Sequence, residues 1–115
     1  MAKDNGLFGN FNEFVEMCED IAERMDCSCK VKEYHRYGFN TVSLETDAFG
    51  GTFVCFNYDL KTGEIVAWKG EKDETSINSI DDVMPCVEKF YNKLGAPRKT
   101  KHFMQDLSDF LKSQY

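Results

Sequence analysis

The stretch that most constrains the fold runs from Thr52 to Gly70 and reads TFVCFNYDLKTGEIVAWKG. Residue types that favour strands lie on both sides of an Asp-Leu-Lys-Thr-Gly segment. Gly63 can take the positive φ that ends a short hairpin loop, because it lacks a Cβ. The stretch therefore predicts a β-hairpin, and the rest of the chain is expected to supply the layers that cover it.

The residues before the hairpin predict one helix and two further strands. Asn10 is a suitable helix cap with Glu13 three residues later, and apolar residues then recur within one stripe of about 120°. Alternation of apolar and polar residues predicts strands at 27–34 and 41–46, with a turn at Gly38 between them. With the hairpin, these strands are expected to form a four-stranded antiparallel meander.

The residues after the hairpin predict two more helices. Residues 70–76 are polar and are interpreted as a linker out of the sheet. Pro85 is tolerated only in a first helical turn, so the second helix is expected to begin near residues 81–82 and to end at Gly95. Thr100 is expected to cap the third helix.

The expected fold is α+β, as a single compact domain over residues 1–115. It consists of an N-terminal helix, a four-stranded antiparallel β-meander and two C-terminal helices packed on the sheet. No apolar run has the length of a membrane span, and no apolar segment in the first ten residues indicates a signal peptide. The odd number of cysteines, five, fits reduced thiols, so we expect a cytoplasmic protein without a membrane partner.

Metal binding and catalysis find little support in the spacing of reactive residues. Cys18, Cys27, Cys29 and His35 are close in sequence, but they do not match the spacing of structural zinc sites. We therefore predict no metal site and no cofactor, and interpret these cysteines as structural thiols. A Cys–His pair could be drawn from Cys29 or Cys55 with His35 or His102, but no nucleophile motif surrounds any of them. No catalytic residue is predicted, and a cryptic small enzyme using His35 is kept as a second alternative.

The first helix is expected to carry acidic residues opposite its apolar stripe. Like-charged residues four positions apart cost helix stability, and a purely structural surface would mix the two signs. The net charge of −6 also disfavours direct nucleic-acid binding. The first prediction is therefore a non-enzymatic interaction module whose acidic face binds a basic, nucleic-acid-binding surface of another protein. The combination is typical of small inhibitors and regulators of the kind that phages and mobile elements encode. The predicted contact residues are Glu13, Glu16, Glu19, Asp20 and Glu23.

The second candidate surface is one face of the hairpin. If Tyr58 pairs with Ile65, simple alternation places Phe53, Val66 and Trp68 together on the face opposite the main apolar layer. One interpretation is that the helices divide between the two faces and cover both. The alternative is that these three residues form a small-molecule-binding, peptide-binding or homodimerising surface, because Trp and Phe are frequent anchors of interfaces.

Overall fold

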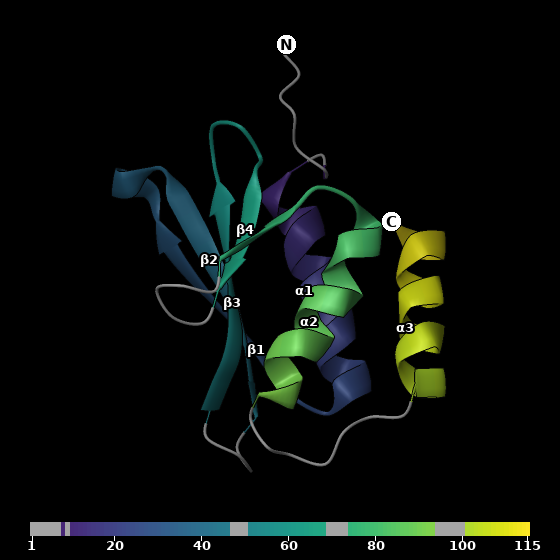
Figure 1. The fold of residues 1–115 in the computed structure, drawn as a ribbon. Helices are drawn as coiled ribbons and strands as arrows, with labels where there is room; N and C mark the ends of the chain where they lie inside the picture. Colours follow the sequence, from purple (N-terminus) through teal and green to yellow (C-terminus); the bar gives the residue numbers. More distant parts are fainter. Residues whose placement is uncertain (1–7, 9, 47–50, 69–73, 94–100) are drawn as a thin grey trace.

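The computed structural model describes residues 8, 10–46, 51–68, 74–93 and 101–115 (Figure 1). It has an N-terminal helix, an antiparallel sheet and two C-terminal helices, which confirms the predicted α+β class. The elements in chain order are α1 (Phe11–Met25), β1 (Ser28–Tyr34), the 3-10 turn η1 (His35–Tyr37), β2 (Phe39–Thr46), β3 (Gly51–Asp59), β4 (Ile65–Trp68), β5 (Thr75–Ile77), the 3-10 turn η2 (Ile80–Asp82), α2 (Val83–Asn92) and α3 (Lys101–Gln114).

The sheet has five strands in the order β1-β2-β3-β4-β5, with every neighbouring pair antiparallel. The predicted meander is therefore present, but the expected number of four strands is wrong by one. Part of the segment interpreted as a linker is β5, in which Ile77 lies opposite Ile65 of β4. This strand has only three residues and two of them are polar, so its sequence shows no alternation long enough to identify.

Helix α1 begins where a local signal in the sequence places it. The side-chain oxygen of Asn10 accepts a hydrogen bond from the N–H of Glu13 at 3.0 Å, which satisfies one of the free N–H groups of the first turn. The helix ends at Met25, and the following residue, Asp26, takes a left-handed conformation with φ of 59°. The buried stripe of α1 consists of Phe14, Met17, Cys18, Ile21, Ala22 and Met25.

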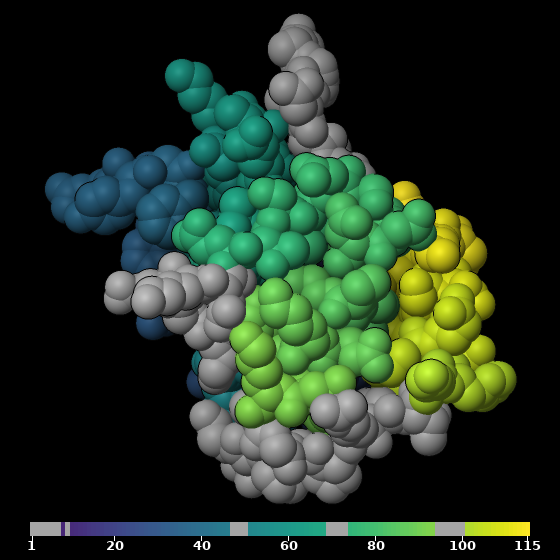
Figure 2. All heavy atoms as spheres, viewed as in Figure 1, coloured from purple at the N-terminus to yellow at the C-terminus, as the bar shows by residue number. Residues whose placement is uncertain are grey.

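The second helix begins through a short 3-10 turn. Ser79 and Asp82 form a reciprocal capping box around η2, and α2 then starts at Val83 with Pro85 inside its first turn. This agrees with the expected start within two residues. The predicted stop at Gly95 and the predicted cap at Thr100 lie outside the described residues. Figure 2 shows α2 and α3 packed beside one another on one face of the molecule.

All three helices lie on the same side of the sheet (Figure 1). The core lies between the two layers and includes the inward side chains of β2, β3, β4 and β5. The interpretation that the helices divide between the two sheet faces is therefore wrong for the part of the chain that the structure describes. The largest fully buried side chains are Phe14, Phe53, Phe56, Phe90, Met17, Ile21, Leu44 and Leu111, together with Val42, Val54, Val83 and Val87.

The position of Phe53 corrects the predicted composition of the second sheet face. The predicted pairing of Tyr58 with Ile65 is confirmed, but the register between β2 and β3 shifts so that Leu44 lies opposite Val54 and Glu45 opposite Thr52. Phe53 is the extra residue of this β-bulge, is fully buried, and packs edge-on against Tyr91 of α2 at 5.3 Å between ring centroids. Simple alternation fails at this residue because a bulge inserts one unpaired position.

The loop of the β3–β4 hairpin is held by one carboxylate. The Oδ1 atom of Asp59 accepts hydrogen bonds from the N–H groups of Lys61 at 2.8 Å and Thr62 at 2.9 Å, and Gly63 closes the loop with φ of 79°. The N–H of Thr62, and with it that of Lys61, lowers the pKa of Asp59 although partial burial opposes this. The charged form of Asp59 is therefore the one that the folded loop stabilises.

Replacing Asp59 by Ala is expected to lower the free energy of unfolding at pH 7 by about 1–2 kcal/mol, because two hydrogen bonds to a charged acceptor are lost. Asp59→Asn keeps an oxygen acceptor and is the matched control. Because the folded-state pKa is lowered, this stability is present above the unfolded pKa of about 3.9 and is lost as the pH falls through the lower folded value. Urea unfolding at pH 7 and pH 3 measures the difference, and a wild-type advantage over Asp59→Asn that grows on acidification would contradict the assignment.

Candidate ligand-binding groove

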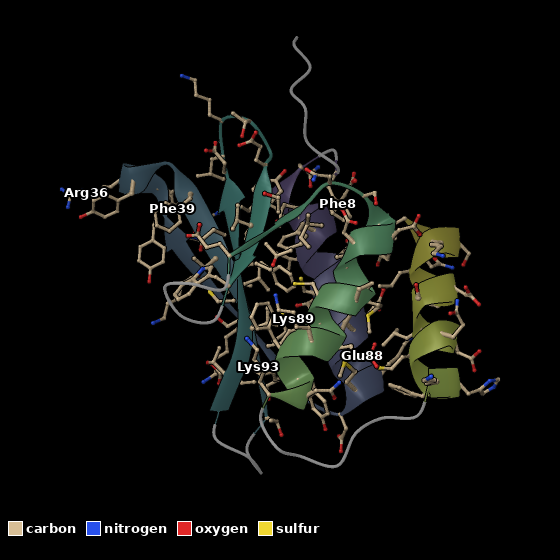
Figure 3. All side chains as sticks on the ribbon, viewed as in Figure 1. Phe8, Arg36, Phe39, Glu88, Lys89 and Lys93 are labelled. Carbon is tan, nitrogen blue, oxygen red and sulfur yellow. The ribbon has the colours of Figure 1, made fainter. Side chains whose placement is uncertain are left out.

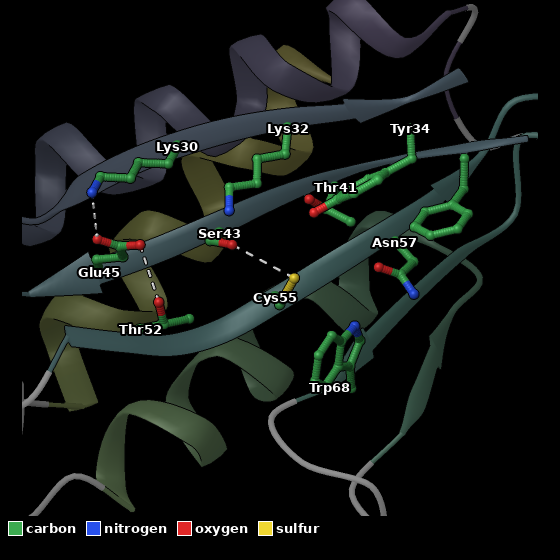
Figure 4. Close-up of a pocket in the computed structure, with 11 residues that line it drawn as sticks. Lys30, Lys32, Tyr34, Thr41, Ser43, Glu45, Thr52, Cys55, Asn57 and Trp68 are labelled. Carbon is green, nitrogen blue, oxygen red and sulfur yellow. Dashed lines mark hydrogen bonds and ion pairs between the residues drawn. The ribbon is translucent and has the colours of Figure 1, made fainter. Parts of the chain in front are cut away.

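The face of the sheet turned away from the helices carries a groove of about 690 Å³ (Figure 4). We call this surface the open-face groove. Its side chains come from four strands, so a continuous row of polar and aromatic groups crosses the sheet from β1 to β4. The lining residues are Lys30, Lys32, Tyr34, Phe39, Thr41, Ser43, Glu45, Thr52, Cys55, Asn57 and Trp68.

Strand pairing explains why residues distant in sequence meet here. Ser43 of β2 lies opposite Cys55 of β3, and Cys55 in turn lies opposite Trp68 of β4. In the other direction along the strand order, Lys30 of β1 lies opposite Ser43. Because residues opposite one another in an antiparallel sheet project to the same face, these four side chains form one row across the groove.

At each of the two ends of the groove, the lining residues contact one another. At one end the rings of Tyr34 and Phe39 stack with centroids 5.2 Å apart and an interplanar angle of 27°. At the other end Glu45 pairs with the ammonium of Lys30 at 3.2 Å and accepts a hydrogen bond from the hydroxyl of Thr52 at 3.1 Å. The negative charge of Glu45 is therefore already matched by Lys30.

The centre of the groove combines a cation with a thiol. The side chain of Lys32 leans from β1 across β2 towards Ser43 and Cys55 (Figure 4). The hydroxyl of Ser43 donates to the sulfur of Cys55 at 3.5 Å. Burial raises the pKa of the Cys55 thiol, although the hydrogen bond from Ser43 and the charge of Lys32 act in the opposite direction. The thiol therefore stays protonated at neutral pH. Lys32 is the cation of this central part, and no carboxylate among the described residues pairs with it.

Two polar atoms in the groove are buried without a hydrogen-bond partner in the described structure. They are the indole nitrogen Nε1 of Trp68, which can only donate, and the side-chain oxygen Oδ1 of Asn57, which can only accept. Leaving such an atom unpaired in a folded protein costs free energy of about 1–3 kcal/mol. Unpaired buried polar atoms in a native structure are often explained by a bound molecule or a function, and both of these residues line the same groove.

The Cys–His pairs considered from the sequence do not assemble. His35 lies in η1 and contacts Glu33 at 2.9 Å, whereas His102 lies on α3 and contacts Asp106 at 3.2 Å. Neither histidine lines the open-face groove, where Cys55 lies. Figure 3 shows the tip of the β1–β2 hairpin, marked by Arg36, projecting away from the helices.

The remaining cysteines show no arrangement for metal binding in the described part of the chain. No group of three or more His, Cys, Asp or Glu side chains among these residues is placed to hold a metal ion. All five cysteines are free thiols, and Cys18 is completely buried in the core. Burial, assisted by the charge of Glu19 and by Cys27, raises the pKa of Cys29 to about 11, so this thiol is not a ready nucleophile.

The predicted acidic face of α1 is exposed except at one residue. Glu13, Glu16, Glu19 and Glu23 are exposed, and no described cation pairs with Glu16, Glu19 or Glu23. Asp20 instead accepts a hydrogen bond from the hydroxyl of Tyr115 at 2.6 Å, which joins α1 to the end of the chain after α3. Asp20 therefore has a structural contact that the sequence did not reveal.

The second predicted surface is only partly present. Val66 and Trp68 lie half-buried on the open face, whereas Phe53 belongs to the core. Sequence reasoning missed the contribution of β1 and β2, above all Lys32. The alternation of lysines and a tyrosine on the polar face of β1 could have indicated this contribution. Its interpretation as part of a groove, however, requires knowing which side of the sheet the helices cover.

Comparison of the chain with protein-family models, with curated proteins and with solved structures finds no match. Within the described residues, no helix is long and apolar enough to cross a membrane. The fold and the groove therefore assign this protein to a structural class only. It is a small α+β domain with all described helices on one side of an antiparallel sheet and a polar, aromatic groove on the other.

Proposed function

We propose that this protein is a non-catalytic binding module that takes a small molecule or a short peptide in the open-face groove. The observation that carries the proposal is the placement of all described helices on one side of the sheet, which leaves a groove of about 690 Å³ around Trp68 on the other. Pockets for small ligands commonly have volumes of about 300–1,000 Å³ and combine apolar surface with a few polar groups. The rings of Tyr34, Phe39 and Trp68 supply the apolar surface, and Lys32, Ser43 and Asn57 are among the polar groups.

A groove-filling variant tests this proposal. Ser43→Phe places a ring in the middle of the groove on the solvent side of β2, and Ser113→Phe makes the same change at an exposed position of α3. A library of metabolites and short peptides is screened for compounds that raise the melting temperature of the wild type. The Ser43→Phe variant is expected to lose at least about tenfold in affinity for each such compound, equivalent to about 1.4 kcal/mol, while Ser113→Phe keeps it.

Circular dichroism of the two variants checks that both are folded before binding is compared. If no library member stabilises the wild type, or if Ser43→Phe binds the stabilising compounds as well as Ser113→Phe does, the groove is not the binding site.

The acidic face of α1 supports a second candidate function, in which the protein is an inhibitor or regulator that binds a basic surface of another protein. The specific observation is that Glu16, Glu19 and Glu23 are exposed without a described cationic partner. Unmatched charge of one sign favours steered association with a partner of opposite charge. The five free thiols are compatible with a cytoplasmic setting for either function.

Removing the negative charges of the acidic face of α1 tests this second candidate function. Replacing Glu16, Glu19 and Glu23 together by Gln is expected to weaken capture of a basic partner and to flatten its dependence on salt. Replacing Glu64, Glu74 and Glu88 by Gln removes the same charge from other elements and is the control. Pull-down from the native host at low and high salt, with mass spectrometry, makes the comparison. Equal recovery of every partner by the two triple variants would eliminate the acidic face as the contact surface.

A further inference from the structure

We propose that the ligand of the open-face groove is a small planar aromatic anion, with its ring against Trp68 and its carboxylate or phosphate at the ammonium of Lys32. This inference rests on the proposed binding function and names the chemistry that the groove recognises. Three observations support it: the charge balance of the groove, the unpaired atoms beside its aromatic surface, and the charge of the whole chain.

The charge balance of the groove favours an anionic ligand. Of the three charged residues that line it, Lys30 and Glu45 neutralise one another through a contact of 3.2 Å. Lys32 is left with no described carboxylate, and it leans over the groove towards Ser43 and Cys55 (Figure 4). The groove therefore carries one uncompensated positive charge. An ammonium in such a position forms its strongest hydrogen bonds with a carboxylate or a phosphate.

The residues on the β3 and β4 side of the groove favour a ligand with a flat ring and polar edges. Trp68 is half-buried on β4 and offers an aromatic surface, on which planar rings stack favourably beyond the effect of their buried area. Its Nε1 donor and the Oδ1 acceptor of Asn57 are both unpartnered. Both atoms are buried, so a heteroaromatic ring with an acceptor and a donor at its edge would satisfy them once the Trp68 and Asn57 side chains turn towards the groove.

The overall charge favours a small ligand over a polymer. The chain carries a net charge of −6, which repels a long polyanion, whereas a ligand with one or two charges feels this repulsion weakly. The groove crosses three strand spacings from β1 to β4, or roughly 14 Å, which suits one aromatic group and its anionic substituent. A carboxylate and a phosphate are both compatible with a single lysine, so the test uses one probe of each kind.

The test follows the indole N–H of Trp68 by nuclear magnetic resonance, because the chain has a single tryptophan and therefore a single such signal. Two aromatic anions, AMP and phenylacetate, are compared with their uncharged counterparts, adenosine and phenylacetamide, and with the ringless anions inorganic phosphate and acetate. At least one aromatic anion is expected to shift the signal with a dissociation constant at least about tenfold below those of its neutral and ringless counterparts.

Two lysine variants assign the anion site. Lys32→Gln is expected to bring the affinity for the aromatic anion to that of its neutral counterpart, while Lys61→Gln, in the exposed β3–β4 loop outside the groove, leaves it unchanged. A preference for AMP alone identifies a phosphate ligand, and a preference for phenylacetate alone a carboxylate ligand.

Several results would overturn the inference. If the neutral rings shift the Trp68 signal as strongly as the anions, the groove binds ligands but does not select an anion. The proposed binding function would then survive without this inference. If none of the six probes shifts the signal, or if a single-stranded hexathymidylate binds more tightly than AMP at the same salt concentration, the ligand is not a small aromatic anion.

Discussion

Phe14→Ala is expected to lower the free energy of unfolding by about 3–5 kcal/mol, the largest loss that we predict for a single substitution. Phe14 of α1 is completely buried, and its ring lies 5.5 Å from Phe8, 5.5 Å from Phe56 and 5.7 Å from Tyr58. Together with Phe11, whose ring lies 5.2 Å from that of Tyr58, it joins the N-terminal helix to β3. Removing the ring loses its burial and leaves a cavity among three aromatic side chains, which cannot all move to fill it.

Urea unfolding followed by circular dichroism measures this loss. Because small domains are stable by only about 5–15 kcal/mol, the variant should unfold at a much lower urea concentration. Phe14→Leu keeps most of the volume and is the matched control, with an expected loss of roughly 1–2 kcal/mol. A loss below about 1 kcal/mol for Phe14→Ala would show that α1 does not pack on β3 through this ring.

Phe53→Ala is expected to cost about 3–4 kcal/mol, whereas Val66→Ala is expected to cost about 1 kcal/mol. The sequence places both residues on the same face of the hairpin, but the bulge in β3 directs Phe53 into the core against Tyr91, while Val66 stays half-buried on the open face. The difference between the two losses of unfolding free energy therefore tests whether the bulge is present. Equal costs for the two substitutions would mean that β3 pairs with β2 without a register shift.

The elements that the sequence predicts correctly are those specified by neighbouring residues. Asn10 caps α1 through the N–H of Glu13, and Gly63 closes the hairpin loop at positive φ. In both cases a few residues determine the backbone conformation, whatever the rest of the chain does. The pairing of Tyr58 with Ile65 follows from the same loop, because the length of a hairpin loop fixes its register.

The predictions that failed depend on tertiary contacts. Phe53 departs from the alternating pattern because a β-bulge turns its side chain towards Tyr91. No residue type in β3 predicts that bulge. Which side of the sheet the helices cover is decided by packing of the whole chain, and it determines whether Trp68 faces a helix or a groove. Lys32 and Trp68 are 36 positions apart and share the groove only through the pairing of four strands, so their combination could not be identified from local patterns.

Crystallographic fragment screening tests most directly whether the open-face groove is the ligand site. Crystals in which this face is free of lattice contacts are soaked with a library of small ring compounds, both anionic and neutral. Under this assignment, bound fragments are expected to gather in the groove, against Trp68 and Asn57 and within reach of Lys32. Fragments that bind elsewhere, for example beside Met84 and Met104 between α2 and α3, with none in the groove, would contradict it.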